Sequence, residues 1–426
     1  MKYFNPANLA VITCPGGDVF ADEVIEHLRH KYRHSRKNTE EELSKRYNIS
    51  IEQASLHIDL MNRVVIRGAD SQSGNDRHIN RSFKVPVKFT LFPNGEIKSE
   101  IEESIRGKDV YIFQDVENRQ PVKFFGGQIV NNLSINDHLM TIMVTVDAAR
   151  QAGAERITLV IPSYPYSRQH KAKGREGLTA SRIGKIFESL GVNHIITLDI
   201  HSRDITNAFH KMRLENLHAS YQIIQTLTQM DGILNDDFVV VSPDTGAVDR
   251  NKFYASALKK PLALLYKERD YSKLAKDASQ SNISQIRLLG NVKDKTVFMA
   301  DDLLGTGGTL IKGMKLLKEN GARKIICAIS LPLFSGDAIS HFDEAYKEGL
   351  FYRIIGTNAV YHEEVIKREW YVNVNITRLF AHVILRLHQN QSVSSLLDNS
   401  VIINRLLVKT ITPEPQNELP FLESVT

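Results

Sequence analysis

The sequence contains little cysteine and no long apolar run, and both absences narrow what the protein can be. Only two of the 426 residues are cysteines, Cys14 and Cys327, which is too few for a disulfide framework. Each lies in a short apolar run, so we expect two small buried side chains in a reducing compartment. No apolar stretch approaches the roughly 18 residues of a membrane span, and the N-terminal segment lacks the apolar region of a signal peptide. We therefore expect a cytoplasmic protein that does not associate with membranes.

The excess of one sign of charge over the other is also small. The chain has 54 Lys and Arg against 49 Asp and Glu, a net charge of +5 spread along its length. Such an excess suits acidic small molecules such as phosphates, and it is too diffuse to indicate nucleic-acid binding. Hydrophobic residues make up 42% of the chain and charged residues 24%, as in ordinary globular proteins. The length allows two α/β domains, each with its own core.

Short β-branched runs alternate with longer helical patterns, which predicts an α/β fold with doubly wound parallel sheets. The alternation occurs twice, so we expect two similar halves with a boundary near residues 216–220. In the first half the expected strands are 9–13, 109–114, 157–162 and 194–199, with helices near 19–30, 137–152 and 179–190. In the second half they are 238–242, 262–266, 296–300 and 324–330, with a helix near 310–320.

A polar segment interrupts this alternation at about residues 35–81. It is rich in Lys, Arg, Glu and Asn, and it contains two candidate helix starts. Thr39 with Glu42, and Ser50 with Gln53, both have the spacing of a capping box. We expect a helical insertion here, and a tail after about residue 410.

The strongest chemical signal is a buried strand that leads into two acids, a Gly/Thr-rich loop and a helix. Glycines let backbone N–H groups close around a phosphate, and a helix N-terminus adds partial positive charge. The carboxylates would repel a phosphate but match the vicinal hydroxyls of a ribose, so a sugar phosphate satisfies both parts. The alternative is a tight strand-to-helix turn with Thr309 as its cap. The predicted substrate-binding residues are Asp301, Asp302, Thr306, Gly307, Gly308 and Thr309.

Polar segments also follow the other expected strands, and in open α/β sheets ligands bind just beyond the carboxyl ends of the strands. In the first half they are 163–175 and 199–202, and in the second half 243–250 and 267–269. A further segment, 92–96, reads Phe-Pro-Asn-Gly-Glu and lies between two extended segments.

Taken in this order, the segments resemble the phosphoribosyl diphosphate synthetases, also called ribose-phosphate diphosphokinases. The similarity runs from Leu9 to about Leu397, with interruptions at 35–81 and near 118–129. The loop at 305–309 is also typical of type I phosphoribosyltransferases, and the remaining segments separate the two families. The resemblance implies two similar doubly wound domains of the type I phosphoribosyltransferase kind. The implied domains are 1–217 on the ATP side, 218–375 on the ribose-phosphate side, a helix at 376–397 packing back on the first domain, and a tail at 398–426.

On the ATP side, the resemblance implies roles for two groups of residues. Phe92, Asn94 and Glu96 would hold the adenine of ATP, partly from a neighbouring subunit. Arg168 and Gln169 would complete the ATP site, with Arg168 close to the phosphates.

For the metal and the catalytic loop, the resemblance implies that His201 and Asp244 position Mg²⁺. Lys267 and Arg269 match the paired basic residues of the family's catalytic loop. Two cations at alternate residues of an extended segment point to one side and can clamp phosphates during transfer. Seen without the resemblance, Lys-x-Arg would be read as a solvated charge cluster and His201 as a structural residue.

The implied activity is transfer of a diphosphoryl group from Mg·ATP to the 1-hydroxyl of ribose 5-phosphate, giving phosphoribosyl diphosphate and AMP. The implied assembly is a homo-oligomer built from dimers, with a hexamer as one form. Three positions depart from the family pattern, namely Gly305, Ala247 and Asp249. Two alternatives stay open: a phosphoribosyltransferase that consumes phosphoribosyl diphosphate, and a non-catalytic regulatory relative of the synthetase.

Overall fold

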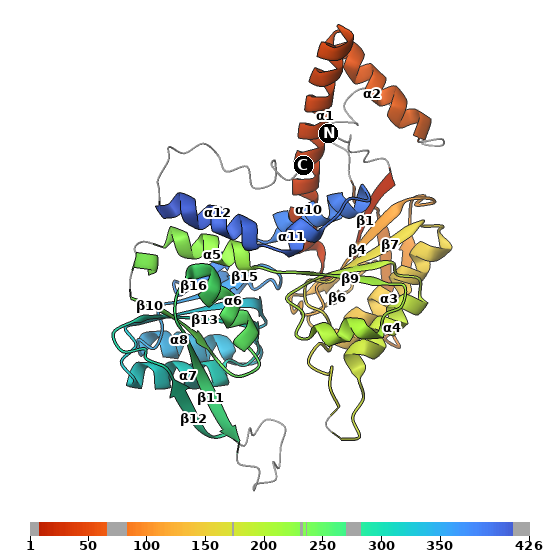
Figure 1. The fold of residues 1–426 in the computed structure, drawn as a ribbon. Coiled ribbons are helices and arrows are strands. Elements are labelled where there is room, and N and C mark those ends of the chain that lie inside the picture. The colour runs from red at the N-terminus through yellow and green to blue at the C-terminus, as the bar shows by residue number, and fades with distance from the viewer. Residues whose placement is uncertain are drawn as a thin grey trace. The chain divides into compact units, whose positions relative to one another are not determined.

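The computed structural model describes residues 8–65, 83–172, 174–230, 233–235, 237–269 and 283–411 (Figure 1). The chain forms two compact units. Unit 1 comprises Met1–Asn216 and Thr377–Ser394, and unit 2 comprises Leu217–Ile376 and Ser395–Thr426. Each unit has its own sheet and its own hydrophobic core.

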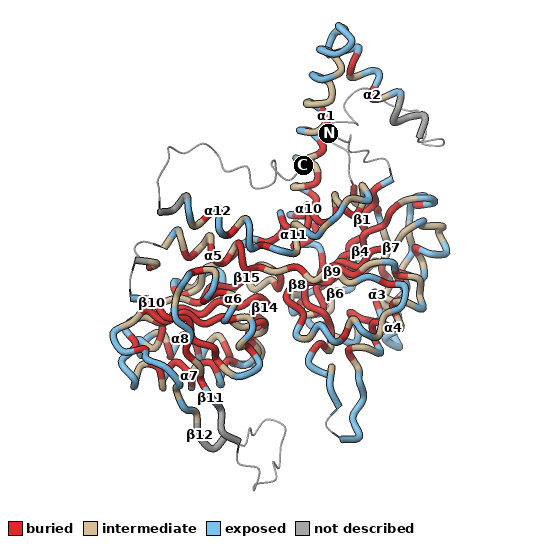
Figure 2. The backbone as a smooth tube through the Cα atoms, viewed as in Figure 1, coloured by how far each residue is buried: buried red, intermediate tan, exposed pale blue. Residues whose placement is uncertain are grey.

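Within the described residues, the main sheet of unit 1 has five strands in the order β1-β4-β7-β8-β9, and the first four pair in parallel. Their Val- and Ile-rich sequences are almost entirely buried, as expected for parallel strands covered on both faces (Figure 2). The strands are β1 (Leu9–Thr13), β4 (Asp109–Phe113), β7 (Arg156–Val160), β8 (His194–Leu198) and β9 (Arg213–Leu217).

The helices and small ribbons of unit 1 surround this sheet. Helix α10 packs along α1, where the rings of Phe20 and Phe380 meet edge to face at 5.0 Å. The hairpin of β2 and β3 packs against α3. The helices are α1 (Asp18–Tyr47), α2 (Ile51–Val65), α3 (Ile135–Gln151), α4 (Thr179–Ser189) and α10 (Thr377–His388), with a 3-10 helix at Arg203–Ala208. The ribbons are β2 (Val87–Leu91) with β3 (Ile97–Ile101), and β5 (Val122–Lys123) with β6 (Ile129–Val130).

Helix α1 is much longer than the predicted 19–30, and its second half projects from the sheet of unit 1 with α2 folded back beside it (Figures 1 and 2). The guanidinium of Arg36 holds the two helices together: Nη1 donates to Asp59 at 2.8 Å and Nη2 to Ser55 at 2.6 Å. We call α2 and residues 34–47 of α1 the arm. The arm lies inside the predicted insertion, whose remaining residues fall outside the described part of the chain.

Only one of the two predicted helix starts in the insertion is correct. Ser50 and Gln53 form the expected capping box before α2, with bonds of 3.1 Å and 3.0 Å between side chains and backbone. Thr39 does not begin a helix, because α1 continues through it and its hydroxyl donates to the Ser35 carbonyl at 2.8 Å. No glycine or proline interrupts residues 31–47, so the helix has no reason to end there.

The sheet of unit 2 has seven strands within the part of the chain that the structure describes, in the order β12-β11-β10-β13-β14-β15-β16. All neighbours pair in parallel except β12, which runs antiparallel to β11. The strands are β10 (Phe238–Ser242), β11 (Leu262–Arg269), β12 (Ile283–Leu289), β13 (Thr296–Leu304), β14 (Lys324–Pro332), β15 (Arg353–Thr357) and β16 (Tyr371–Val374). The helices are α5 (Ser220–Gln229), α6 (Val248–Leu258), α7 (Gly308–Glu319), α8 (Ala338–Lys347), α9 (Glu363–Ile366), α11 (Ser394–Leu397) and α12 (Ser400–Ile411), with a 3-10 helix at Ile233–Asn235.

The predicted tail at 398–426 is wrong over its first part, because residues 400–411 form helix α12 of unit 2. Ile403 and Leu406 are buried, and α12 packs against α5 and α6. The side-chain amide of Asn399 anchors the helix by donating to the His218 carbonyl at 3.0 Å. The apolar pattern that drives this packing spans only a few residues, and the prolines that follow it favour an irregular tail in the sequence. Residues 412–426 lie outside the described part.

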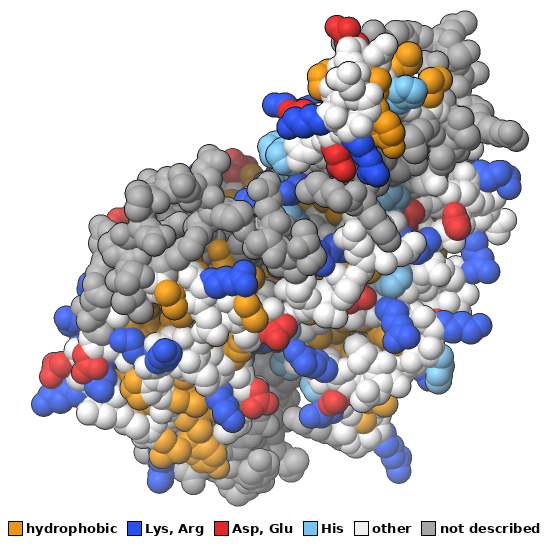
Figure 3. Space-filling view, turned by 45° about the horizontal axis from the view of Figure 1, so that its top comes forward, with side chains coloured by type: hydrophobic (Ala, Val, Ile, Leu, Met, Phe, Trp, Pro, Cys, Tyr) orange, Lys and Arg blue, Asp and Glu red, His pale blue; other side chains and the backbone are white. Residues whose placement is uncertain are grey.

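The expectation that both cysteines are buried is confirmed. Cys14 and Cys327 are both fully buried and not joined in a disulfide, and burial raises the pKa of the Cys14 thiol to about 12. On the face seen in Figure 3, basic and acidic side chains are interspersed over the surface. Among the described residues, no helix combines the length and apolar character needed to cross a membrane.

Candidate active site

The predicted sugar-phosphate motif lies at the carboxyl end of β13 in unit 2. The strand continues through both acids to Leu304, so Asp301 and Asp302 belong to the strand rather than to the loop after it. Pairing with β14 extends as far as Leu304 and Pro332, which keeps this backbone extended. Asp302 is 8% exposed and Asp301 is half-buried, so both carboxyls lie in a largely dehydrated place.

The turn between β13 and α7 is built around Gly307. This residue has φ +76°, and a Cβ on it would lie 2.3 Å from the ring of Phe342. The turn is also held by a 3.1 Å hydrogen bond from the Ser335 N–H to the Gly305 carbonyl. Glycine is therefore required at 307 both by its left-handed backbone and by the close ring.

Helix α7 begins directly after this turn, and its first residues are exposed. Thr306, Gly308 and Thr309 all face solvent, and no side chain in the described part of the chain caps the first turn. The predicted alternative, a turn capped by Thr309, is therefore wrong. An uncapped helix N-terminus with glycine beside it is suited to binding an anion.

The two acids of β13 affect each other's ionisation. Burial raises the pKa of Asp301, and the negative charges of Asp302 and Asp244 raise it further against a weaker opposing effect of Arg250. The Asp301 carboxylate also accepts a hydrogen bond of 2.9 Å from the Asp302 N–H. Two adjacent carboxyls suit hydroxyl partners, which can donate to whichever carboxyl is ionised.

Asp244 occupies the turn that follows the neighbouring strand β10. Its Oδ1 accepts hydrogen bonds of 3.0 Å from the N–H groups of Gly246 and Ala247, at the start of α6. The Ser242 hydroxyl donates to the Asp244 carbonyl at 2.7 Å and tightens the same turn. Since β10 and β13 are neighbours in one sheet, the structure brings Asp244 within electrostatic range of Asp301.

Lys267 and Arg269 lie at the end of β11, which runs three residues beyond the predicted 262–266. The backbone is extended there, as predicted, and pairs with β12. The register shifts between Glu268 and Arg269, so the strict alternation assumed for the two basic residues is interrupted at that point. The side chains of 267–269 lie outside the described part.

In unit 1, residues 92–96 form the tight turn of the β2–β3 hairpin. The Phe92 N–H donates to the Glu96 carbonyl at 2.8 Å, and the Asn94 side chain accepts from the Glu96 N–H at 3.2 Å. The Phe92 ring is 41% exposed at the tip of this turn. The turn therefore presents an aromatic face and two polar side chains to solvent.

Arg168, Gln169 and His201 follow β7 and β8, at the carboxyl edge of the main sheet of unit 1. Arg168 and Gln169 are exposed, and the ring of His201 lies 5.2 Å from that of His170. The turn at 92–96, which was predicted to bind the adenine of the same ATP, belongs to a separate two-stranded sheet.

One basic residue of this edge escaped the sequence analysis. Burial raises the pKa of Glu117, and the positive charges of Arg119 and Arg168 oppose that rise. Arg119 and Arg168 therefore both lie within electrostatic range of Glu117. The sequence pattern gives no signal for Arg119, because it falls in the interruption near 118–129 and its two-residue spacing from Glu117 is common.

The two predicted metal ligands belong to different units, His201 to unit 1 and Asp244 to unit 2. Among the residues that the structure describes, no three His, Cys, Asp or Glu side chains group together as a metal centre would require.

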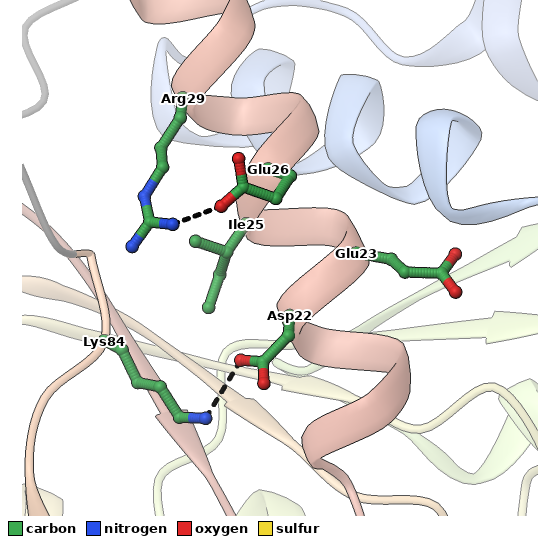
Figure 4. Close-up of a pocket in the computed structure, with 6 residues that line it drawn as sticks. All are labelled: Asp22, Glu23, Ile25, Glu26, Arg29 and Lys84. Carbon is green, nitrogen blue, oxygen red and sulfur yellow. Dashed lines mark hydrogen bonds and ion pairs between the residues drawn. The ribbon is translucent and has the colours of Figure 1, made fainter. Parts of the chain in front are cut away.

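A surface pocket in unit 1 lies between α1 and the segment at Lys84 (Figure 4). Four of its charged side chains pair within the pocket: Lys84 lies 2.9 Å from Asp22, and Arg29 pairs with Glu26. The fifth, Glu23, points away from them (Figure 4). None of the predicted site residues lines this pocket.

Comparison with known proteins finds matches along most of the chain. A model of the N-terminal domain of ribose phosphate pyrophosphokinase matches residues 75–191, and a phosphoribosyl transferase domain model matches 208–356. A ribose-phosphate pyrophosphokinase of Nostoc is 34% identical over 313 residues, which cover 73% of this chain and 86% of that protein. The chain belongs to the ribose-phosphate pyrophosphokinase family.

Other relatives give the same result. Ribose-phosphate pyrophosphokinase A of Dictyostelium discoideum is 34% identical over 311 residues, which cover 72% of this chain and 89% of that protein. A crystal structure of phosphoribosylpyrophosphate synthetase from Mycobacterium smegmatis aligns with a TM-score of 0.64 at 24% identity, covering 90% of this chain and 99% of that one. The predicted family and the predicted pair of parallel-sheet domains are therefore confirmed.

Proposed function

We propose that this member of the pyrophosphokinase family is an active ribose-phosphate diphosphokinase of the cytoplasm. It would transfer the diphosphoryl group of ATP to ribose 5-phosphate. The observation that supports this best is the end of β13, where two dehydrated acids precede an uncapped, glycine-lined helix N-terminus. A sugar and a phosphate need these two environments side by side.

The ribose 5-phosphate would bind entirely within unit 2. Its phosphate would accept hydrogen bonds from the backbone N–H groups at the start of α7 and from the hydroxyls of Thr306 and Thr309. Its 2- and 3-hydroxyls would donate to Asp301 and Asp302. Because the turn at Gly307 lies close to the ring of Phe342, we expect the phosphate to bind without a large rearrangement of this turn.

ATP would be held by the residues of unit 1. The exposed Phe92 ring would stack on adenine, while Asn94 and Glu96 would hydrogen-bond to its edge. Gln169 would assist there, and Arg168, together with Arg119, would neutralise phosphate charge.

In the reaction, the 1-hydroxyl oxygen of ribose 5-phosphate attacks the β-phosphorus of ATP. The new O–P bond forms as the bond to the α–β bridging oxygen breaks, AMP leaves with that oxygen, and the hydroxyl proton passes to solvent. Lys267 and Arg269 would stabilise the negative charge that spreads over the transferring group. Mg²⁺, when bound, neutralises phosphate charge, and Asp244 is its best-suited ligand because hard cations prefer oxygen. His201 would contribute from unit 1. The enzyme would act as a homo-oligomer built from dimers.

A non-catalytic regulatory role is the second candidate, favoured by the departures at Gly305, Ala247 and Asp249. The two candidates differ in one assay. Purified protein with Mg²⁺, ATP and ribose 5-phosphate should form AMP and phosphoribosyl diphosphate in equal amounts. Absence of any ribose-dependent AMP would refute the enzymatic role and leave the regulatory one.

The catalytic loop is tested by substitution. We expect Lys267→Ala to lower kcat by about two to four orders of magnitude, because a transition-state contact is lost. The matched control is Lys347→Ala, which removes an exposed lysine at the end of α8 and should leave turnover unchanged. Equal turnover in both variants would remove the loop from the mechanism.

A further inference from the structure

Strand β10 stops pairing with β13 before β13 reaches its two acids. The register between them ends at Val240 and Phe298, whereas the pairing of β13 with β14 continues to Leu304. If β10 continued to pair with β13, its next hydrogen bonds would go to the backbone N–H and carbonyl of Ala300, the residue directly before Asp301. On the β10 side, that backbone needs another partner, because buried peptide groups must be hydrogen-bonded.

The side chain of Asn251 in α6 provides that partner. Its Oδ1 accepts from the Ala300 N–H at 2.9 Å, and its Nδ2 donates to the Ala300 carbonyl at 2.8 Å. The two backbone groups fix which end of the amide is oxygen and which is nitrogen. Asn251 is fully buried, so these bonds are made away from water.

Asn251 also reaches the other side of the site. Its Nδ2 donates a second bond, of 2.9 Å, to the carbonyl of Ala247. The N–H of that same residue is bonded to the Asp244 carboxylate. One amide therefore links the turn that carries Asp244 to the strand that carries Asp301 and Asp302.

We propose that Asn251 is a positioning residue for ribose 5-phosphate. It replaces the missing strand as the hydrogen-bonding partner of β13 and fixes the peptide from which Asp301 and Asp302 project. This role rests on the proposed function of unit 2. In this role Asn251 does not contact the substrate. Its loss should weaken the binding of ribose 5-phosphate and leave the binding of ATP unchanged.

The test is Asn251→Leu, which keeps the side-chain volume but leaves the Ala300 N–H and carbonyl without their partner. Kd for ribose 5-phosphate, measured by calorimetry on the full chain, should weaken by about tenfold to a hundredfold, because two buried backbone bonds are lost. KM for ribose 5-phosphate should rise in parallel. KM for ATP should stay within about twofold, because the ATP residues lie in unit 1.

The matched control is Leu258→Ala, which deletes a buried side chain from the end of the same helix. It should lower the melting temperature at least as much as Asn251→Leu and leave the Kd for ribose 5-phosphate unchanged. If both variants weaken that Kd equally, or if neither does, the positioning role is wrong. If the wild-type protein neither binds ribose 5-phosphate nor forms AMP, the proposed function fails instead.

Discussion

Asp109 is buried and Asp301 is half-buried, both lie in parallel strands, and their surroundings shift the two pKa values in opposite directions. Asp109 begins β4 in unit 1, where Arg156 Nε donates to it at 2.9 Å and His388 Nδ1 lies 2.9 Å away. Burial alone would raise the pKa of Asp109, but these hydrogen bonds outweigh it and hold the pKa below its usual value. Asp301, near the end of β13 in unit 2, has a raised pKa because burial disfavours its charged form, and the neighbouring acids Asp302 and Asp244 raise the pKa further.

The difference in pKa follows from the end of the strand at which each aspartate lies. Asp109 and Arg156 face each other at the amino ends of β4 and β7, where the paired charges fasten α10 to the sheet through the Leu387 carbonyl. Asp301 lies at the carboxyl end of β13, the edge at which α/β sheets bind ligands. The charge of Asp109, which is paired within the chain, contributes to stability, whereas the crowded acids at the end of β13 are the ones we propose to bind the sugar substrate.

The largest effect on stability should come from Asp109→Asn. We expect unfolding of unit 1 to become easier by about 3 kcal/mol, since Arg156 would lose its ionic partner while remaining mostly buried. Hydrogen exchange of β4 and β7 would measure this. The exposed pair of Asp22 with Lys84 is the control, and Asp22→Asn should cost less than about 1 kcal/mol.

The effect of Asp109 should depend on pH in a defined direction. Its folded pKa lies below the unfolded value, so its stabilisation is fully present above about pH 4 and is lost as the pH falls through the folded pKa. The difference between wild type and Asp109→Asn should therefore shrink as the pH falls below about 4. A difference that grows in acid would contradict the pairing.

Asp301→Asn should act in the opposite direction on stability. Its folded pKa is raised, so the destabilisation by the ionised carboxyl is absent below about pH 4 and grows as the pH rises toward the folded pKa. The variant should melt a few degrees above wild type at pH 8, a gain on the order of 1 kcal/mol, and the two should converge near pH 4. Turnover with ribose 5-phosphate should fall by about a hundredfold, since a hydroxyl partner is lost. A variant that is less stable at pH 8 would contradict the crowding of the acids.

Three glycines sharpen the comparison between the packed turn of unit 2 and the exposed hairpin of unit 1. Gly307→Ala combines a left-handed backbone with a ring at 2.3 Å and should cost about 2 kcal/mol or more. Gly95→Ala has φ +90° but open space around its Cβ, so it should cost only about 1 kcal/mol. Gly308→Ala has neither constraint and should change stability by less than about 0.5 kcal/mol. Thermal melts of the three variants give the order, and equal costs would show that the Phe342 contact is unimportant.

The sequence predicts those features whose partners are close along the chain. The strands, their polar carboxyl ends and the Ser50 cap depend on spacings of one to four residues, and they are found where expected. The extension of β13 through Asp301 depends on pairing with β14, and the burial of α12 depends on α5 and α6. The role of Asn251 depends on β10 diverging from β13. These contacts join residues far apart in sequence, and no local pattern signals them.

The smallest predicted effects on stability concern Thr39 and Ser50, which look alike in sequence but differ in structure. Both have the capping-box spacing, but only Ser50 begins a helix. Ser50→Ala should therefore destabilise α2 by about 1 kcal/mol, because the Gln53 N–H loses its acceptor. Thr39→Ala should be neutral or slightly stabilising, since alanine has the higher helix propensity inside α1. Helix content and hydrogen exchange of the arm would distinguish the two, and a larger loss from Thr39→Ala would mean that α1 ends before residue 39 in solution.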